Sequence, residues 1–210
     1  LFGKVHRVTS TRALQDNDTL AKLLIRRIVL HYDDDIRKNF GKQKYQDEIK
    51  HIIGYQRRNH FIRKLTLDLN GNTLVLYNYV EKHGKPLYEN IKFHADEKRK
   101  IFFVSGNTAA SDREAIRAIV EKQKNAIIVA SLGTFSTGIN IRNLHNIVFA
   151  SPSKSQIRVL QSIGRGLRKT DDSITTTLYD IVDDISWKTR KNYGILHADE
   201  RLRIYGREKF

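Results

Sequence analysis

Short apolar segments alternate with segments of helical periodicity along the chain after residue 72. The apolar segments predict strands at 74–80, 101–104, 126–130, 146–150 and 175–182. Helical periodicity between them predicts helices at 84–93, 111–122 and 153–168. Buried strands separated by helices of this length are typical of βαβ units. We therefore predict an α/β fold, a parallel sheet with helices on both faces.

The two ends of the chain are less regular. Residues 1–72 are mixed and polar, with a short strand predicted at Ile28–Tyr32 and helices at 45–53 and 57–69. Gly71-Asn72 then breaks the pattern. The segment after Trp187 is basic and aromatic, and we predict a helix there. In a parallel sheet, ligands bind at the carboxyl ends of the strands, so the loops after the predicted strands are the place to look for a site.

Composition narrows the function. The 210 residues contain 38 Lys and Arg against 23 Asp and Glu, a formal net charge of +15. This charge favours a polyanionic partner, with nucleic acid the first expectation and an acidic membrane surface the second. The absence of cysteine excludes disulfides, Cys-ligated zinc and thiol catalysis. The chain starts at Leu1 and contains no methionine, which suggests a fragment.

No apolar segment approaches the roughly 20 residues that a membrane helix needs. No apolar stretch follows the first residues as in a signal peptide. We therefore expect no membrane-spanning segment, and with nucleic acid as the preferred polyanion we expect no membrane partner and a cytoplasmic location.

Two arginines, Arg165 and Arg168, lie three residues apart in Gln161-Ser-Ile-Gly164-Arg165-Gly-Leu-Arg168. This spacing places both guanidinium groups on one face of a helix, where each can form paired hydrogen bonds with phosphate oxygens. The alternative is a helix C-terminus stabilised by cations and ended by glycine.

A second candidate is the hydroxyl-rich loop from Ala130 to Asn140, which contains Ser131, Thr134 and Gly138. Its hydroxyl and backbone N–H groups could hold phosphates or sugar hydroxyls, although an ordinary surface loop has the same composition. The stretch from Lys122 to Thr170 contains no acidic residue and eight basic ones. Solvated faces normally mix both signs, so this stretch suggests a surface that faces phosphates.

The two motifs together resemble motifs V and VI of superfamily-two helicases. Ser136-Thr-Gly-Ile-Asn140 corresponds to motif V, and Gln161-x-x-Gly-Arg-x-x-Arg168 to motif VI. The order and spacing fit across residues 73–183. The amino-acid sequence of these segments, including Tyr179-Asp-Ile-Val-Asp-Asp184, is most similar to that of phage UvsW-type DNA helicases. These are relatives of type III restriction and XPB-like translocases.

The resemblance implies that residues 73–185 form the second RecA-like domain of a helicase. Residues 1–72 would be the connector from a first RecA-like domain, and residues 186–210 a basic helical tail. The first domain would carry a Gly-x-x-x-x-Gly-Lys-Ser/Thr phosphate loop and a magnesium-holding Asp-Glu pair, and this chain has neither in the required context. The resemblance thus implies that ATP and Mg²⁺ are shared with that domain, and that this chain alone is inactive.

The resemblance also implies residue roles. Arg165 and Arg168 would supply positive charge to the γ-phosphate, and Gln161 would sense the nucleotide. Gly138 and Asn140 would lie near its ribose, with Asn140 standing where many relatives have Asp. The residues expected to contact DNA are Ser105, Gly106, Ser131 and Thr134.

Other readings remain open. The acidic residues Asp180, Asp183 and Asp184 could indicate a metal nuclease, or else capping or domain contacts. Trp187 and the basic residues after it could stack on bases, or belong to a terminal helix packed on the sheet. A non-catalytic nucleic-acid-binding module and the motor part of a type III restriction subunit are the alternative functions. His51, His60, His83 and His94 lack metal-ligand spacing, which favours ordinary core or solvated histidines.

Overall fold

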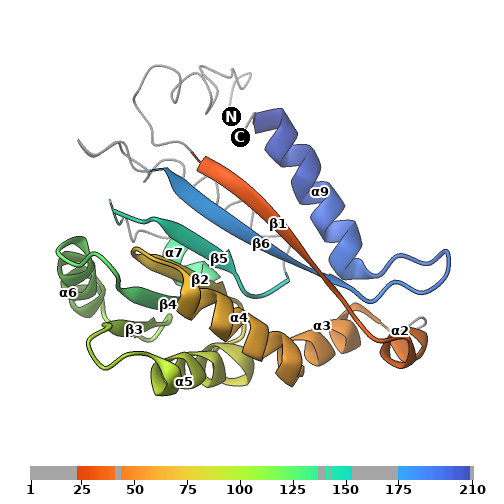
Figure 1. The fold of residues 1–210 in the computed structure, drawn as a ribbon, viewed down its shortest axis with the longest axis horizontal. Coiled ribbons are helices and arrows are strands. Elements are labelled where there is room, and N and C mark those ends of the chain that lie inside the picture. Colours follow the sequence, from red (N-terminus) through yellow and green to blue (C-terminus); the bar gives the residue numbers. More distant parts are fainter. Residues whose placement is uncertain (1–22, 41–43, 137–140, 142, 153–174, 209–210) are drawn as a thin grey trace, which may run out of the picture.

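A six-stranded parallel sheet forms the centre of the molecule (Figure 1). The computed structural model describes residues 23–40, 44–136, 141, 143–152 and 175–208. The strand order is β1-β6-β5-β2-β4-β3. The strands are β1 (Leu23–His31), β2 (Thr73–Tyr77), β3 (Ile101–Val104), β4 (Ile127–Ser131), β5 (Asn146–Phe149) and β6 (Thr176–Asp184). The predicted RecA-like α/β fold is confirmed.

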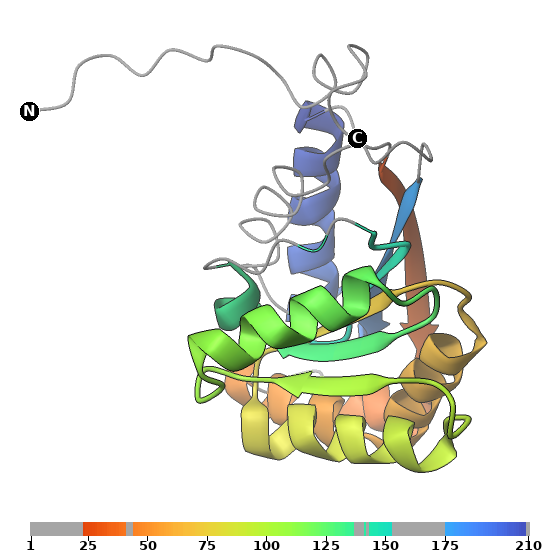
Figure 2. The same ribbon diagram turned by 90° about the vertical axis from the view of Figure 1, so that its left-hand side faces the viewer.

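Helices cover both faces of this sheet (Figures 1 and 2). One face packs against α4 (Gln56–Asp68) and α5 (Lys85–His94), and the other against α6 (Ala110–Glu121), α7 (Leu132–Ser136) and α9 (Tyr193–Glu208). Successive residues of the central strands alternate between the two apolar cores, as pleating requires. Every residue of β2, β4 and β5 is buried, which explains why their sequences read as continuous apolar runs.

Residues 23–72 contribute directly to the same fold, although we expected a connector there. β1 pairs with β6 in parallel, from Leu23 opposite Thr176 to His31 opposite Asp184. Three helices follow it, α2 (Asp34–Phe40), α3 (Tyr45–Gly54) and α4. β1 is an edge strand with a mixed burial pattern, so the sequence pattern predicted only its second half.

The C-terminal segment packs as a helix, α9, against β6. Its anchor is Arg201, which is 1% exposed and donates from Nε and Nη2 to the buried carboxylate of Asp180 at 3.0 and 2.8 Å. The hydroxyl of Tyr205 donates to the same carboxylate at 3.0 Å. The predicted tail is therefore a layer of the domain, at least over its described residues. None of the described helices has the length and apolar character needed to cross a membrane.

Candidate nucleotide and nucleic-acid interface

The loops that follow β3 and β4 lie side by side at the carboxyl edge of the sheet. Val104 pairs with Ala130 in the parallel register, so the next residues, Ser105 and Ser131, begin neighbouring loops. β2 lies on the other side of β4, with Tyr77 opposite Ser131. The strand order thus brings together three loops that are far apart in sequence. This is the edge at which ligands bind in open α/β sheets.

The hydroxyl groups of Ser131 and Thr134 face each other in the loop after β4. Their Oγ atoms are 2.6 Å apart, and the backbone N–H of Thr134 donates to Ser131 Oγ at 3.2 Å. Both residues are buried. Ser131 therefore caps the short helix α7 in the manner of an N-cap residue. The two predicted DNA contacts shape the loop that leads into residues 137–140.

The turn after β3 has a similar internal arrangement. The N–H of Ser105 donates to Thr108 Oγ1 at 3.0 Å, and the N–H of Asn107 donates to Ser105 Oγ at 3.4 Å. Ser105 is buried, whereas Gly106 and Asn107 are exposed at the tip. A Cβ added at Gly106 would meet no atom within 4 Å. Of the four residues predicted to contact DNA, Gly106 is thus the one placed openly on the surface.

A buried polar cluster lies beneath the loops after β2 and β5. His83, in the short π-helix η1 (Val80–Gly84), places Nδ1 2.9 Å from Ser151 Oγ, and the N–H of Asn78 donates to the same oxygen at 3.1 Å. His83 is 1% exposed. Burial, together with the nearby charge of Arg58, lowers the pKa of His83 to about 3, so the ring is neutral at pH 7. His83 is a core histidine, as its sequence context favoured.

His83 and Ser151 were not predicted as part of the site. π-Helical turns are rare and are frequent at functional sites, but their sequences carry no distinctive pattern. Ser151 is the second residue after β5. The cluster lies two residues before the segment 153–174, which contains the Gln-x-x-Gly-Arg-x-x-Arg motif and lies outside the described residues.

Two acidic residues of β6, Asp180 and Asp183, form buried ion pairs. Asp183 accepts from Arg58 Nε at 2.7 Å and from Tyr32 at 2.9 Å, while Asp180 accepts from Arg201. Asp184 lies 3.3 Å from His31 and accepts from the N–H of Ser186. These carboxylates hold the fold together. Among the described residues, no group of three or more His, Asp or Glu side chains could hold a metal ion.

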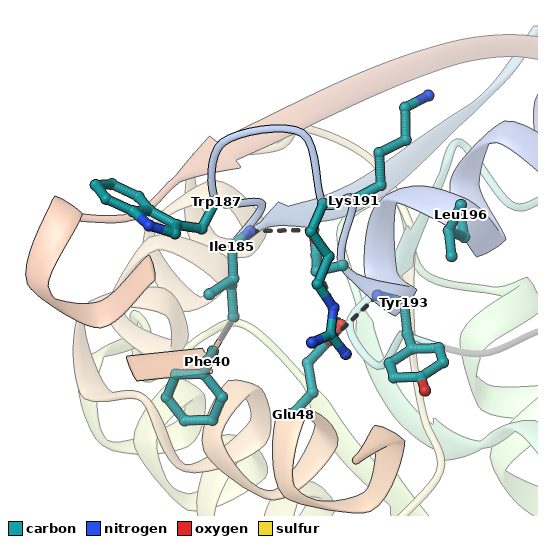
Figure 3. A pocket seen from close by; sticks show the side chains of 9 residues that line it. Phe40, Glu48, Ile185, Trp187, Lys191, Tyr193 and Leu196 are labelled. Carbon is teal, nitrogen blue, oxygen red and sulfur yellow. Dashed lines mark hydrogen bonds between the residues drawn. The ribbon is translucent and has the colours of Figure 1, made fainter. Parts of the chain in front are cut away.

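A hollow of about 140 Å³ lies beyond the end of β6, between α3 and the start of α9 (Figure 3). The buried carboxylate of Glu48 accepts from the N–H groups of Tyr193 and Gly194 at 3.0 and 2.7 Å, and from Asn192 Nδ2 at 2.8 Å. A carboxylate is favoured there because it satisfies free donors at a helix N-terminus. Glu48 therefore ties α3 to α9.

The aromatic residues of this region, Trp187 and Tyr193, contact other parts of the fold. The Trp187 ring lies 5.7 Å from the Arg37 guanidinium and 5.4 Å from Lys38 Nζ, both on α2. The Tyr193 ring meets Tyr45 edge to face at 5.4 Å. The interpretation as a packed terminal segment fits these contacts better than base stacking does.

The predicted nucleotide-binding and catalytic residues lie outside the described residues. They are Gly138, Asn140, Gln161, Arg165 and Arg168. The described loops offer hydroxyl and backbone groups that fit phosphate or ribose oxygens, and they offer no carboxylate cluster that fits Mg²⁺.

Comparison with known proteins agrees with the class that the fold defines, a RecA-like α/β domain. A model of the helicase conserved C-terminal domain matches residues 56–170, more than half of the chain. The chain therefore belongs to the helicase C-terminal domain family. The match begins at α4, within the segment that we expected to be a connector.

Individual relatives point the same way. The chain is 36% identical to the ATP-dependent DNA helicase uvsW of Enterobacteria phage T4, and the match covers the whole chain and 44% of that helicase. The crystal structure of T4 UvsW superposes with a TM-score of 0.78 at 35% identity, over all of this chain and 42% of that one. A Type ISP restriction-modification enzyme, LlaBIII, shares the fold, with a TM-score of 0.54 at 17% identity over 92% of this chain and 14% of that one.

Proposed function

We propose that the chain is the second motor domain of an ATP-dependent DNA helicase or translocase that remodels branched DNA in recombination and repair. The observation that carries the proposal is the 36% identity to a phage DNA helicase across the whole chain. The six-stranded RecA-like sheet supports it, because the segments that bear the two motifs follow β4 and β5 in the sequence, and both strands end at the carboxyl edge. A first RecA-like domain of the same protein would supply the other wall of the nucleotide site.

In this proposal Arg165 and Arg168 stabilise the charge that develops on the γ-phosphate during transfer. Gln161 contacts the nucleotide, and Gly138 and Asn140 lie beside its ribose. An arginine supplied from a second domain makes hydrolysis depend on domain closure, which couples ATP turnover to movement along DNA. The phosphate loop and the Mg²⁺ ligands belong to the first domain.

DNA would run over the loops after β3 and β4. The internal bonds of Ser131 with Thr134, and of Ser105 with Thr108, hold these loops in shape. The exposed Gly106 allows a phosphate backbone to approach closely. Such contacts carry little sequence information, so binding should be independent of sequence.

The decisive experiment uses the full two-domain enzyme with Arg165→Ala and Arg168→Ala. Each change should lower kcat for DNA-stimulated ATP hydrolysis by about 10³-fold or more while leaving DNA affinity nearly unchanged. Arg203→Ala, an exposed arginine on α9, is the matched control and should leave kcat within twofold. If the motif arginines merely stabilise a helix end, the changes would cost about 0.3–1 kcal/mol of stability and leave turnover intact.

A further inference from the structure

Two lysine-rich turns meet at the amino edge of the sheet, opposite the loops that follow β3 and β4, which we call the motif loops. Residues 95–100 lead into β3, and residues 122–125 lead into β4. The N–H of Ile127 donates to the carbonyl of Lys100 at 2.9 Å, and Arg99 Nε donates to the carbonyl of Asn125 at 3.1 Å. A hollow of about 550 Å³ lies between the turns and the ends of α4 and α5. We call this region the amino-edge surface.

The amino-edge surface carries an excess of uncompensated positive charge. Lys98, Lys100, Lys122 and Lys124 are all exposed, and they form no ion pair with any residue that the structure describes. Asp96 and Glu97 are the acidic residues within the two turns, and Asp96 accepts a hydrogen bond from the backbone of Lys98. Elsewhere in the described part of the chain, Lys85 pairs with Glu81 and Lys191 with Asp199.

Arg99 lines the hollow, and its guanidinium is held in place by backbone carbonyl groups. Arg99 is half-buried, and its Nη1 and Nη2 atoms donate to the carbonyls of Leu67 and Leu69 at 2.8 Å each. With Nε bound to Asn125, all three nitrogens of Arg99 face carbonyl oxygens. No described carboxylate neutralises the guanidinium, so its charge adds to that of the lysines around it.

An exposed aromatic ring flanks this charge. Phe93, at the end of α5, is 84% exposed, and its ring contacts the ring of His94, which lines the hollow, at 5.0 Å. Cations beside an exposed aromatic ring are typical of surfaces that bind nucleic acid, where the ring stacks on a base and the cations follow the phosphates. A site for a small anion would not need the ring.

The amino-edge surface is separated from the motif loops by the length of the strands. β3 and β4 have four and five residues, which span about 13–17 Å. We propose that the amino-edge surface binds the phosphate backbone of a second DNA segment, distinct from the one on the motif loops. The inference rests on the proposed function. It explains physically why the domain would act on branched DNA, because two arms of one junction can contact opposite edges of the domain.

The test uses Lys98→Gln/Lys100→Gln in the full two-domain enzyme. The control of equal charge change is Lys44→Gln/Lys50→Gln, at the residue before α3 and on α3 itself. Dissociation constants for a forked duplex and for a single strand are measured from low to physiological salt. The surface variant should bind the fork about tenfold more weakly at low salt, and the slope of log affinity against log salt should fall by about 1–2. Its affinity for the single strand and the control's affinity for both should match the parent enzyme.

Unchanged fork binding in the surface variant, or equal losses for fork and single strand, would overturn the inference. Thermal unfolding of both variants checks that the fold is intact, since exposed substitutions of this kind change stability by less than about 0.5 kcal/mol. The proposed function fails in a different way, through the absence of DNA-stimulated ATP hydrolysis in the parent enzyme. The two failures are therefore distinguishable.

Discussion

Arg58 and Asp183 form an ion pair that is completely enclosed by the fold. Their side chains are 1% and 0% exposed, and Nε and Nη2 of the arginine reach the two carboxylate oxygens at 2.7 and 3.1 Å. The pair joins α4, which begins the family match, to the carboxyl end of β6. Two charges buried in this way are tolerated only together, because either one alone would lie in a poorly solvated interior.

Removing either partner of this pair should therefore be costly. We expect Arg58→Met and Asp183→Asn each to lower the free energy of unfolding by about 3–5 kcal/mol, and the double variant to lose much less than the sum. Urea unfolding of the four proteins at pH 7 measures the coupling energy. The exposed Lys85–Glu81 pair is the matched control and should give a coupling below about 0.5 kcal/mol. A similarly small coupling for Arg58 and Asp183 would contradict this account.

His83 should make stability depend on pH. Its pKa is about 3 in the folded state and 6.5 in the unfolded chain, so the unfolded state binds more protons between these values. Stability should then rise with pH through this window, and its loss on acidification below pH 6.5 should approach about 1.4 kcal/mol per pH unit from this residue. In His83→Gln this contribution disappears. Urea unfolding should be measured from roughly pH 4 to pH 7.5, which covers most of this window. The variant's stability should then depend less on pH than that of the parent protein, and identical pH profiles would rule the explanation out.

Gly84 is required by close packing in the π-helical turn. A Cβ at this position would overlap the ring of Tyr77, which is held by a stacking contact with Phe103 at 5.5 Å and a hydrogen bond to the Val104 carbonyl. Gly84→Ala should therefore destabilise the protein by about 1–3 kcal/mol. Gly206→Ala, in α9, meets nothing within 4 Å and should stabilise it by about 0.5–1 kcal/mol. Thermal unfolding should show shifts of opposite sign, and shifts of the same sign would refute the packing argument.

The central strands could be predicted because a buried strand has a run of apolar residues in its own sequence. β2, β4 and β5 are covered on both faces, so each appears as an unbroken apolar run. β1 is different, because an edge strand can carry polar residues such as Arg26 and Arg27 within it. Its position beside β6 depends on a pairing between segments about 150 residues apart, which no local pattern reports.

The charged contacts could not be predicted for the same reason. Arg58 and Asp183 are separated by 125 positions in the sequence, and each alone looks like a surface charge. For the hydroxyl residues, the local sequence suggests a site but does not report the contacts of the side chains. The sequence predicts Ser105 and Ser131 as DNA contacts, and this stays a prediction, but only the folded turns reveal that their side chains are buried and bind neighbouring backbone and side-chain groups.

The isolated chain should not hydrolyse ATP. Its sequence has no Gly-x-x-x-x-Gly-Lys-Ser/Thr loop, and orienting the β- and γ-phosphates for transfer requires such a cradle together with Mg²⁺. One wall of the site can supply charge to the transition state but cannot position the reacting phosphate. Phosphate release with saturating DNA should therefore be the same for the chain and for its Arg165→Ala variant, which serves as the control for contaminating ATPases. The contrary result would be DNA-stimulated turnover of about 1 s⁻¹ or more, within the range of ordinary enzymes, that disappears in the variant. It would show that the chain holds a complete site and that the active site is not divided between two domains.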